Sequence, residues 1–136
     1  MISMKRVLGT GAAALALLTG GVAMAPVASA ASPQQACSTI DIGSLCLTRS
    51  DAGYDARFHN RSASVKRLDF RLYCHSSVTL IKRPGTLMVP SRGNFISTPN
   101  RVNTFHFDRR SVPTGYVCAL GLMNVVSGKE YLTRGI

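Results

Sequence analysis

The sequence predicts an all-β protein: a small antiparallel β-sandwich of seven or eight short strands, held by two disulfides and preceded by a cleaved signal peptide. Three observations support this prediction. Apolar and polar residues alternate over short runs, and turn residues interrupt these runs at intervals of about 8–12 residues. Four cysteines lie after residue 36, in a chain of 136 residues. The sequence has no amphipathic helical pattern and no internal repeat.

The first thirty residues have the pattern of a secretory signal peptide. Lys5 and Arg6 precede an uncharged stretch from 7 to 27, and Ala28-Ser29-Ala30 offers small residues where a signal peptidase cleaves. A retained membrane anchor is the alternative, but several glycines and a proline dilute the apolar stretch. We therefore expect residues 1–30 to be a signal peptide and residues 31–136 to be a single secreted β-domain.

Period-two alternation predicts the strands of that domain in order. Residues 31–36 are polar and are expected to fray. In the two clearest runs, Tyr54 and Phe58 share one face of the first, and Leu68 and Phe70 share one face of the second. Phe105 and other apolar residues later in the chain repeat this pattern. The expected strands are 42–48, 54–59, 67–74, 78–81, 87–89, 94–97, 102–107, 116–123 and 130–133.

Polar residues and residues with special backbone preferences separate these strands. The turn at 60–63 is Asn60-Arg61-Ser62-Ala63, and later turns contain Pro84-Gly85, Pro90-Ser91 and Ser127-Gly128. Asn60-Arg61-Ser62 also matches the N-glycosylation pattern on this expected exposed turn. We interpret that short pattern as a chance match.

The cysteines predict two disulfides, because an even number in a short exported chain is typical of paired sulfurs. Cys74 and Cys118 each fall on the apolar face of a strand, so we expect them to pair across the sandwich core. Cys37 and Cys46 remain as a short second disulfide. A zinc site would need cysteines two to four residues apart or a paired histidine motif, which the sequence lacks. We expect no metal and no cofactor.

The chain is strongly basic, with a formal net charge of +10 at pH 7. Without Lys5 and Arg6 of the leader, 14 basic residues face 6 acidic ones, a net charge of +8. Such a charge attracts anions, and outside a cell these include wall polymers and lipid headgroups. The alternative is that the charge only keeps a small domain soluble.

We expect no catalytic residues, although the residue types of a small nuclease are present. His59, His106, Glu130 and Arg57 could supply an acid, a base and a phosphate ligand. Nothing in their spacing brings them within hydrogen-bond reach of one another. Nucleophile elbows and glycine-rich phosphate loops do not occur after residue 30.

Two surfaces are candidate binding sites. The first is the outward face of a hairpin formed by 54–59 and 67–74, where arginine lies beside an aromatic residue; the alternative is a solvated face with pairs such as Asp69 with Arg57. The second is the loop from 108 to 113, where an exposed basic residue would resemble an inhibitor's bait, and residues 82–85 form a similar loop. The candidate binding residues are Arg57, His59, Arg67, Arg71, Tyr73, Arg109 and Arg110.

Four short runs carry a resemblance to a known group: Cys46-Leu47-Thr48, Ala56-Arg57-Phe58-His59-Asn60, Asp69-Phe70-Arg71-Leu72-Tyr73-Cys74 and Gly115-Tyr116-Val117-Cys118. They resemble small secreted four-cysteine β-domain proteins of actinobacteria. The resemblance spans most of residues 37–136 and implies a bacterial, exported β-domain, but no activity.

We expect a secreted, non-catalytic binding protein, for example an inhibitor of an extracellular enzyme. Its partner would be an extracellular protein or an anionic polymer of the cell envelope. The alternatives are a cationic, antimicrobial-like protein that binds envelope polymers or lipids, and a small secreted nuclease. Binding to polymers should weaken steeply with salt, whereas binding through a buried anchor should survive it.

Overall fold

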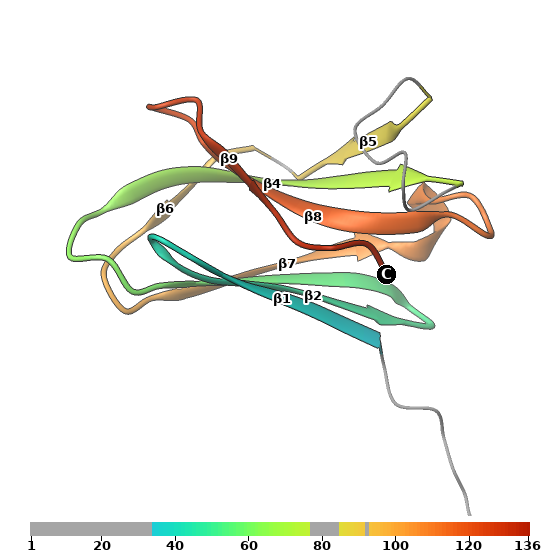
Figure 1. The fold of residues 1–136 in the computed structure, drawn as a ribbon, viewed down its shortest axis with the longest axis horizontal. Helices are drawn as coiled ribbons and strands as arrows, with labels where there is room; N and C mark the ends of the chain where they lie inside the picture. The colour runs from blue at the N-terminus through green and yellow to red at the C-terminus, as the bar shows by residue number, and fades with distance from the viewer. Residues whose placement is uncertain (1–33, 77–84, 92) are drawn as a thin grey trace, which may run out of the picture. The chain divides into compact units, whose positions relative to one another are not determined.

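The computed structural model describes residues 34–76, 85–91 and 93–136 (Figure 1). The expected signal peptide, the expected strand at 78–81 and most of the loop at 82–85 lie outside the described residues. Within these ranges the chain forms nine strands and one short 3₁₀ helix, η4 (Arg109–Ser111). All strand pairs are antiparallel, so the all-β prediction is confirmed. No helix among the described residues is long and apolar enough to cross a membrane.

The first sheet has the strand order β1-β2-β3-β7. Its strands are β1 (Gln34–Ile40), β2 (Gly43–Ser50), β3 (Gly53–Asn60) and β7 (Val102–Asp108). Strand β3 shows why the alternation predicted it: Tyr54, Ala56 and Phe58 are buried, while Asp55 and Arg57 between them are exposed. The pleat of a strand sends successive side chains to opposite faces, so one apolar face can cover a core.

The second sheet has the order β5-β4-β8-β9, and β6 also pairs with β4. Its strands are β4 (Lys66–His75), β5 (Leu87–Pro90), β6 (Phe95–Ser97), β8 (Val117–Asn124) and β9 (Glu130–Leu132). The inward residues of both sheets form one hydrophobic cluster between the layers, as a sandwich requires. Its largest fully buried members are Phe58, Phe70, Leu45, Leu47, Leu68, Leu72, Leu120 and Leu122.

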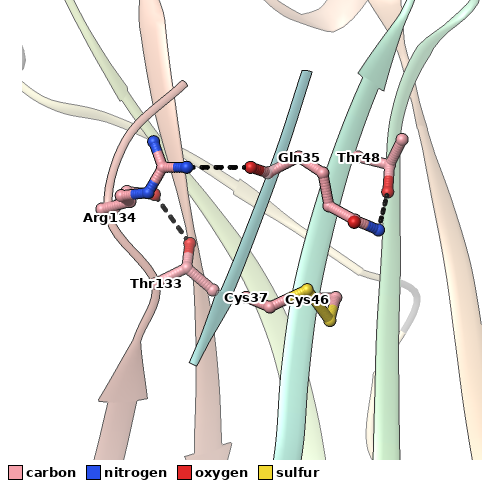
Figure 2. The surroundings of a disulfide bond; sticks show 6 residues. All are labelled: Gln35, Cys37, Cys46, Thr48, Thr133 and Arg134. Carbon is pink, nitrogen blue, oxygen red and sulfur yellow. Dashed lines mark hydrogen bonds between the residues drawn. A yellow bond between two sulfur atoms is a disulfide. The ribbon is translucent and has the colours of Figure 1, made fainter. Parts of the chain in front are cut away.

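Strand β1 corrects the expectation that residues up to 36 fray. Gln34 to Ala36 belong to this strand, and Ala36 is fully buried opposite Leu47. The short disulfide Cys37–Cys46 joins registered neighbours on β1 and β2. Figure 2 shows two further ties around it: Gln35 Nε2 donates to Thr48 Oγ1 at 3.2 Å, and Arg134 donates to the Gln35 carbonyl at 3.0 Å. These contacts order a segment whose own sequence is polar.

Both predicted disulfide pairings are confirmed, but the position predicted for one of them was wrong. The long disulfide Cys74–Cys118 joins registered partners on β4 and β8, which are neighbours in the second sheet. Both cysteines are fully buried on the core side. An inward position was correctly inferred from the alternation, but alternation alone does not tell which sheet a strand joins. Because β4 and β8 belong to the same sheet, the Cys74–Cys118 bond lies within one layer and does not cross the core.

The predicted hairpin between 54–59 and 67–74 was also wrong. Strand β3 lies in the first sheet and β4 in the second, so the intervening residues 61–65 carry the chain from one layer to the other. The partners of β3 are β2 and β7. Arg57 is accordingly registered with Cys46 and Thr104 and has no pairing with Asp69.

Candidate functional site

The change of layer divides the first predicted binding surface. Arg57 and His59 lie on the outer side of the first sheet, whereas Arg67, Arg71 and Tyr73 lie on the outer side of the second. Opposite faces of a sandwich cannot contact one flat partner together. These five residues therefore do not form the single face that the sequence suggested.

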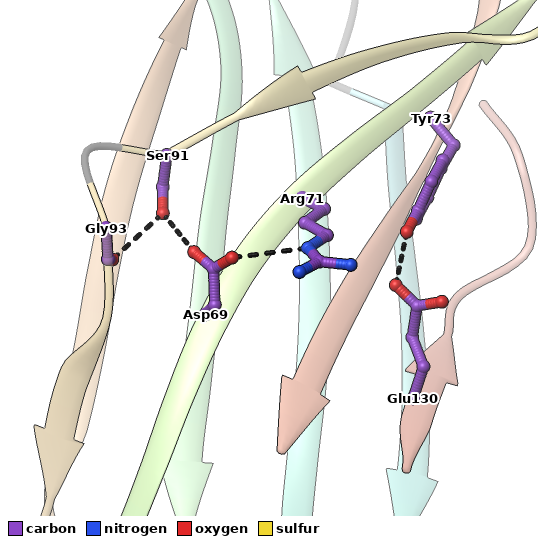
Figure 3. A network of polar contacts seen from close by, with 6 residues as sticks. All are labelled: Asp69, Arg71, Tyr73, Ser91, Gly93 and Glu130. Atoms are coloured by element: carbon purple, nitrogen blue, oxygen red, sulfur yellow. Dashed lines mark hydrogen bonds and ion pairs between the residues drawn. The ribbon is translucent and has the colours of Figure 1, made fainter. Parts of the chain in front are cut away.

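Arg71 and Tyr73 take part in a polar network on the second sheet (Figure 3). Arg71 Nε donates to Asp69 Oδ2 at 3.2 Å, and Ser91 Oγ donates to the other Asp69 oxygen at 2.8 Å. The Tyr73 hydroxyl donates to Glu130, which stands on β9. The Tyr73 ring lies over Gly121, since a Cβ atom there would be 2.6 Å from the ring. Both predicted residues are thus engaged within their own sheet.

Arg109 and Arg110 lie in η4, at the end of β7, where the sequence predicted an exposed loop. Asp108 caps this turn: it accepts the Arg110 backbone N–H at 2.8 Å and the Arg110 guanidinium at 3.1 Å. These hydrogen bonds to Arg110 lower the pKa of Asp108 to about 2. Arg109 Nη1 donates to the Asp51 carbonyl at 3.4 Å. Both arginines are exposed, but each has a local acceptor.

Of the residues proposed for a nuclease, Arg57, His59 and His106 share the outer face of the first sheet, but Glu130 does not join them. His106 Nδ1 lies 2.8 Å from Asp55 Oδ1, and its Nε2 lies 3.2 Å from the Ala52 carbonyl. The hydrogen bond to Asp55 raises the pKa of His106, and the charged ring donates to both acceptors. Glu130 stands in the other sheet, bonded to Tyr73. No group of three or more histidine, cysteine or acidic side chains within the described ranges could hold a metal ion.

A different constellation forms around Asn60, the last residue of β3. Asn60 is fully buried, so it is not the exposed turn residue that the glycosylation pattern suggested. Its Nδ2 donates to the carbonyls of Ser97 at 2.9 Å and Ser64 at 3.2 Å. Its Oδ1 accepts the Ser62 N–H at 2.9 Å, and its own N–H donates to the Arg101 carbonyl at 2.9 Å. One amide thus joins the β3–β4 loop to the segment between β6 and β7.

Four cationic residues lie in the segments that these hydrogen bonds join. Arg61 follows Asn60 directly, and the Arg101 backbone is bonded to it. Lys66 is registered with Ser97, whose carbonyl Asn60 binds, and Arg67 is the next residue of β4. We call these four residues, Arg61, Lys66, Arg67 and Arg101, the basic end. The arginines are exposed and Lys66 is half-buried.

The four cations of the basic end form no ion pair with any described residue. Asp41, in the β1–β2 turn, is the acidic residue close enough to Lys66 to feel its charge. The Asp41 carboxylate accepts hydrogen bonds from the Tyr131 hydroxyl at 2.6 Å and from Lys129 Nζ at 3.1 Å, which lower its pKa. Lys129 therefore neutralises it. The other four aspartates each pair with Arg71, His106, Arg109 or Arg110.

Exposed aliphatic side chains accompany these cations. Arg67 is registered with Ile96 on β6, and its carbonyl accepts the N–H of Val125, just beyond β8. Ile96 is 49 % exposed, and Val126, next in the β8–β9 turn, is 82 % exposed. Figure 1 shows that the β1–β2, β3–β4, β6–β7 and β8–β9 connections all lie at this end of the sandwich. The result is a surface that combines unpaired positive charge with apolar tips.

Of the basic end, sequence reasoning identified Arg67 alone. Arg61 and Lys66 could have been found from the sequence, because together with Arg67 they place three cations within residues 61–67. Arg101 carried no such signal, because the pairing of β3 with β7, continued by the Asn60 bond, brings residue 101 beside the end of β3. Comparison with known proteins adds no assignment: no family model matches the chain, and neither a curated protein nor a solved structure is significantly similar to it.

Proposed function

We propose that this is a secreted, non-catalytic binding protein that attaches to anionic surfaces of the cell envelope through its basic end. The observation that carries the proposal is the gathering, at one end of the sandwich, of four cations that form no ion pair with a described residue. Cationic side chains at a surface attract phosphate-bearing headgroups. The two disulfides suit an oxidising, extracellular setting.

The charge alone supports a useful affinity. Each lysine or arginine near an anionic membrane contributes about 1 kcal/mol, so four contribute about 4 kcal/mol, or about a thousandfold in binding. This attraction falls with ionic strength, since the Debye length is about 10 Å at 0.1 M salt. The rigid frame around Asn60 limits the backbone entropy that binding would otherwise remove.

The aliphatic tips favour a lipid surface over a soluble polymer. Val125 and Val126 project from the β8–β9 turn beside Arg67, and burying an apolar side chain in the headgroup region is favourable. A hydrated polyanion offers nothing to these side chains. We therefore name anionic phospholipid as the ligand and treat a soluble polymer as an outcome of the test.

The test is co-sedimentation of the oxidised protein with vesicles of phosphatidylglycerol or phosphatidylcholine, at low and high salt. We expect binding to the anionic vesicles, weak binding to the zwitterionic ones, and partial release by salt. Arg61→Gln with Arg101→Gln should weaken binding about thirtyfold, the equivalent of two cations.

The matched control is Arg109→Gln with Arg110→Gln, which removes the same net charge from the opposite end of the sandwich. It should change binding by less than about threefold, because these arginines already have carboxylate partners. An equal loss in both double variants would mean that net charge, and not the basic end, determines binding. Tight binding to soluble polyphosphate without vesicle binding would favour the polymer.

An inhibitor of an extracellular enzyme remains the second expectation. Its bait would be Arg110, whose side chain is 91 % exposed. The turn around it is helical and tied to Asp108, whereas a bait is presented in extended form to an active site. A stoichiometric, salt-resistant complex with an extracellular enzyme, lost in Arg110→Gln, would support this function and overturn the lipid proposal if vesicle binding also failed.

A further inference from the structure

The two disulfides differ in their exposure to solvent. Cys74 and Cys118 are fully buried on the core side of β4 and β8. Cys37 is exposed and Cys46 is half-buried, because each alternates with buried residues and so points to the outer side of the first sheet. Strand β1, which carries Cys37, is also an edge strand of that sheet. A thiol in solution can therefore reach the Cys37–Cys46 bond but not the buried one.

A positive charge stands beside Cys46. Arg57 on β3 is registered with Cys46, and registered side chains of an antiparallel pair lie on the same face. Arg57 is exposed and forms no ion pair with any described residue. The acidic residue of β3 on this face, Asp55, is bonded to His106, and the remaining titratable residue there is His59. A neighbouring cation stabilises a cysteine as its thiolate.

We propose that the Cys37–Cys46 disulfide is a site of thiol–disulfide exchange, reduced by a dithiol that attacks the Cys37 sulfur. Exposure favours attack at Cys37, and the charge of Arg57 favours Cys46 as the leaving thiolate. The two features thus select the same direction of attack.

The exchange proceeds in two steps. A thiolate of the reductant attacks Cys37 Sγ, the bond between the two cysteine sulfurs breaks, and Cys46 leaves as a thiolate. The second thiolate of the reductant then attacks its own sulfur in the mixed disulfide and releases Cys37. Two electrons pass from the dithiol, which becomes a disulfide, to the two cysteines, and the two protons of the dithiol follow them.

A dithiol suits this site better than a monothiol. After the first step the Cys46 thiolate stays beside Cys37, since the Cα atoms of these two residues lie 4.1 Å apart in the native register. It can attack the mixed disulfide and restore the original bond. A reductant that carries its own second thiol competes with this return, whereas a monothiol leaves it unopposed.

The test follows reduction of the oxidised, folded protein by dithiothreitol. Samples are alkylated with iodoacetamide over time, and mass spectrometry of the peptides measures the label on each cysteine. Cys37 and Cys46 should be labelled at least about tenfold faster than Cys74 and Cys118, because exposure governs the access of the thiolate.

Arg57→Gln tests the role of the neighbouring charge. One charge near the protein surface changes the stability of a thiolate by about tenfold, and the rate follows about half as strongly on a logarithmic scale, so reduction should slow about threefold. The matched control is Arg110→Gln, which removes the same charge from η4 and should leave the rate unchanged.

The direction of attack is tested with glutathione, a monothiol. After rapid quenching with acid, the glutathione adduct should be found on Cys37 and not on Cys46.

Three results would overturn this proposal: equal labelling of the two disulfides, the same rate of reduction in Arg57→Gln as in the wild type, or an adduct on Cys46. The wild-type measurements stand even if the variant fails to fold. Because none of the residues tested belongs to the basic end, the outcome is independent of vesicle binding.

Discussion

Asn60→Ala tests whether one buried amide holds the basic end together. The wild-type side chain donates to the carbonyls of Ser97 and Ser64 and accepts two hydrogen bonds from Ser62, from its N–H at 2.9 Å and its hydroxyl at 2.6 Å. Alanine removes all four. It also leaves a void, because Asn60 is fully buried.

The expected loss of stability depends on whether water can replace each hydrogen bond that Asn60 made. The Ser97 carbonyl lies in a buried environment, and losing its donor costs about 1–3 kcal/mol. Ser62 and Ser64 are more exposed, so water replaces their lost bonds in part and about 1 kcal/mol remains. We expect a total loss of about 3 kcal/mol, a large part of the about 5–15 kcal/mol that stabilises a typical domain.

The assay is urea unfolding of the oxidised protein. With a typical dependence of about 1.5 kcal/mol per molar urea, the midpoint should fall by about 2 M. Ser62→Ala is the matched control: it keeps the Asn60 side chain and removes the Ser62 hydroxyl, which donates to Asn60 Oδ1 and to the exposed Ser64 carbonyl, so it should cost less than about 1 kcal/mol. A loss under about 1 kcal/mol in Asn60→Ala would refute the idea that this amide organises the end. Where the variant remains folded, it should also bind anionic vesicles less tightly at unchanged net charge.

Three further results follow from the described contacts. Removing the long disulfide by two alanine substitutions should lower the free energy of unfolding by about 4 kcal/mol, and removing the short one should lower it by about 3 kcal/mol. The long disulfide contributes more because its sequence separation is 44 and that of the short one is 9. Calorimetry of each double variant measures the two losses, and equal losses would contradict this order. The pKa of His106, raised by Asp55, should return toward its ordinary value in Asp55→Asn, as measured by NMR titration; the pair stabilises the fold below the ordinary histidine pKa of 6.5 and loses this effect as the pH rises through the raised value. Gly121→Ala should destabilise by about 1–3 kcal/mol because the new methyl meets the Tyr73 ring, and a Tyr73→Ala background should remove most of that loss; no coupling in this cycle would contradict the contact.

The alternation of apolar residues predicted most strands and their inward faces, because a pleated strand with one buried face imposes a period of two. It missed β1 because Gln34, Gln35 and Ser38 have no reason of their own to form a strand. That segment is ordered by its partners, through the disulfide and Arg134. The contact with Arg134 joins residues 99 positions apart, and a local pattern cannot contain it.

The incorrect hairpin has a similar cause. Five residues, 61–65, separate β3 from β4, and a connection of that length suits a hairpin as well as a change of layer. What decides is the inward position of Asn60, which binds the end of β6 and the residue before β7. A polar residue at the end of an apolar face resembles an ordinary turn residue in the sequence.

The ion pairs of the folded chain show which of its basic residues keep an uncompensated charge, which the amino-acid composition alone does not. The sequence records a basic excess but not where it resides, and it directed attention to Arg71, Arg109 and Arg110. Each of these lies within two residues of an aspartate or across a turn from one, so local geometry neutralises it. The excess then falls on residues whose neighbours are serine, valine and asparagine, as around Arg61 and Arg101. The fold brings the segments that carry those residues to one end of the sandwich, and this localised positive charge is the basis of the membrane binding that we propose.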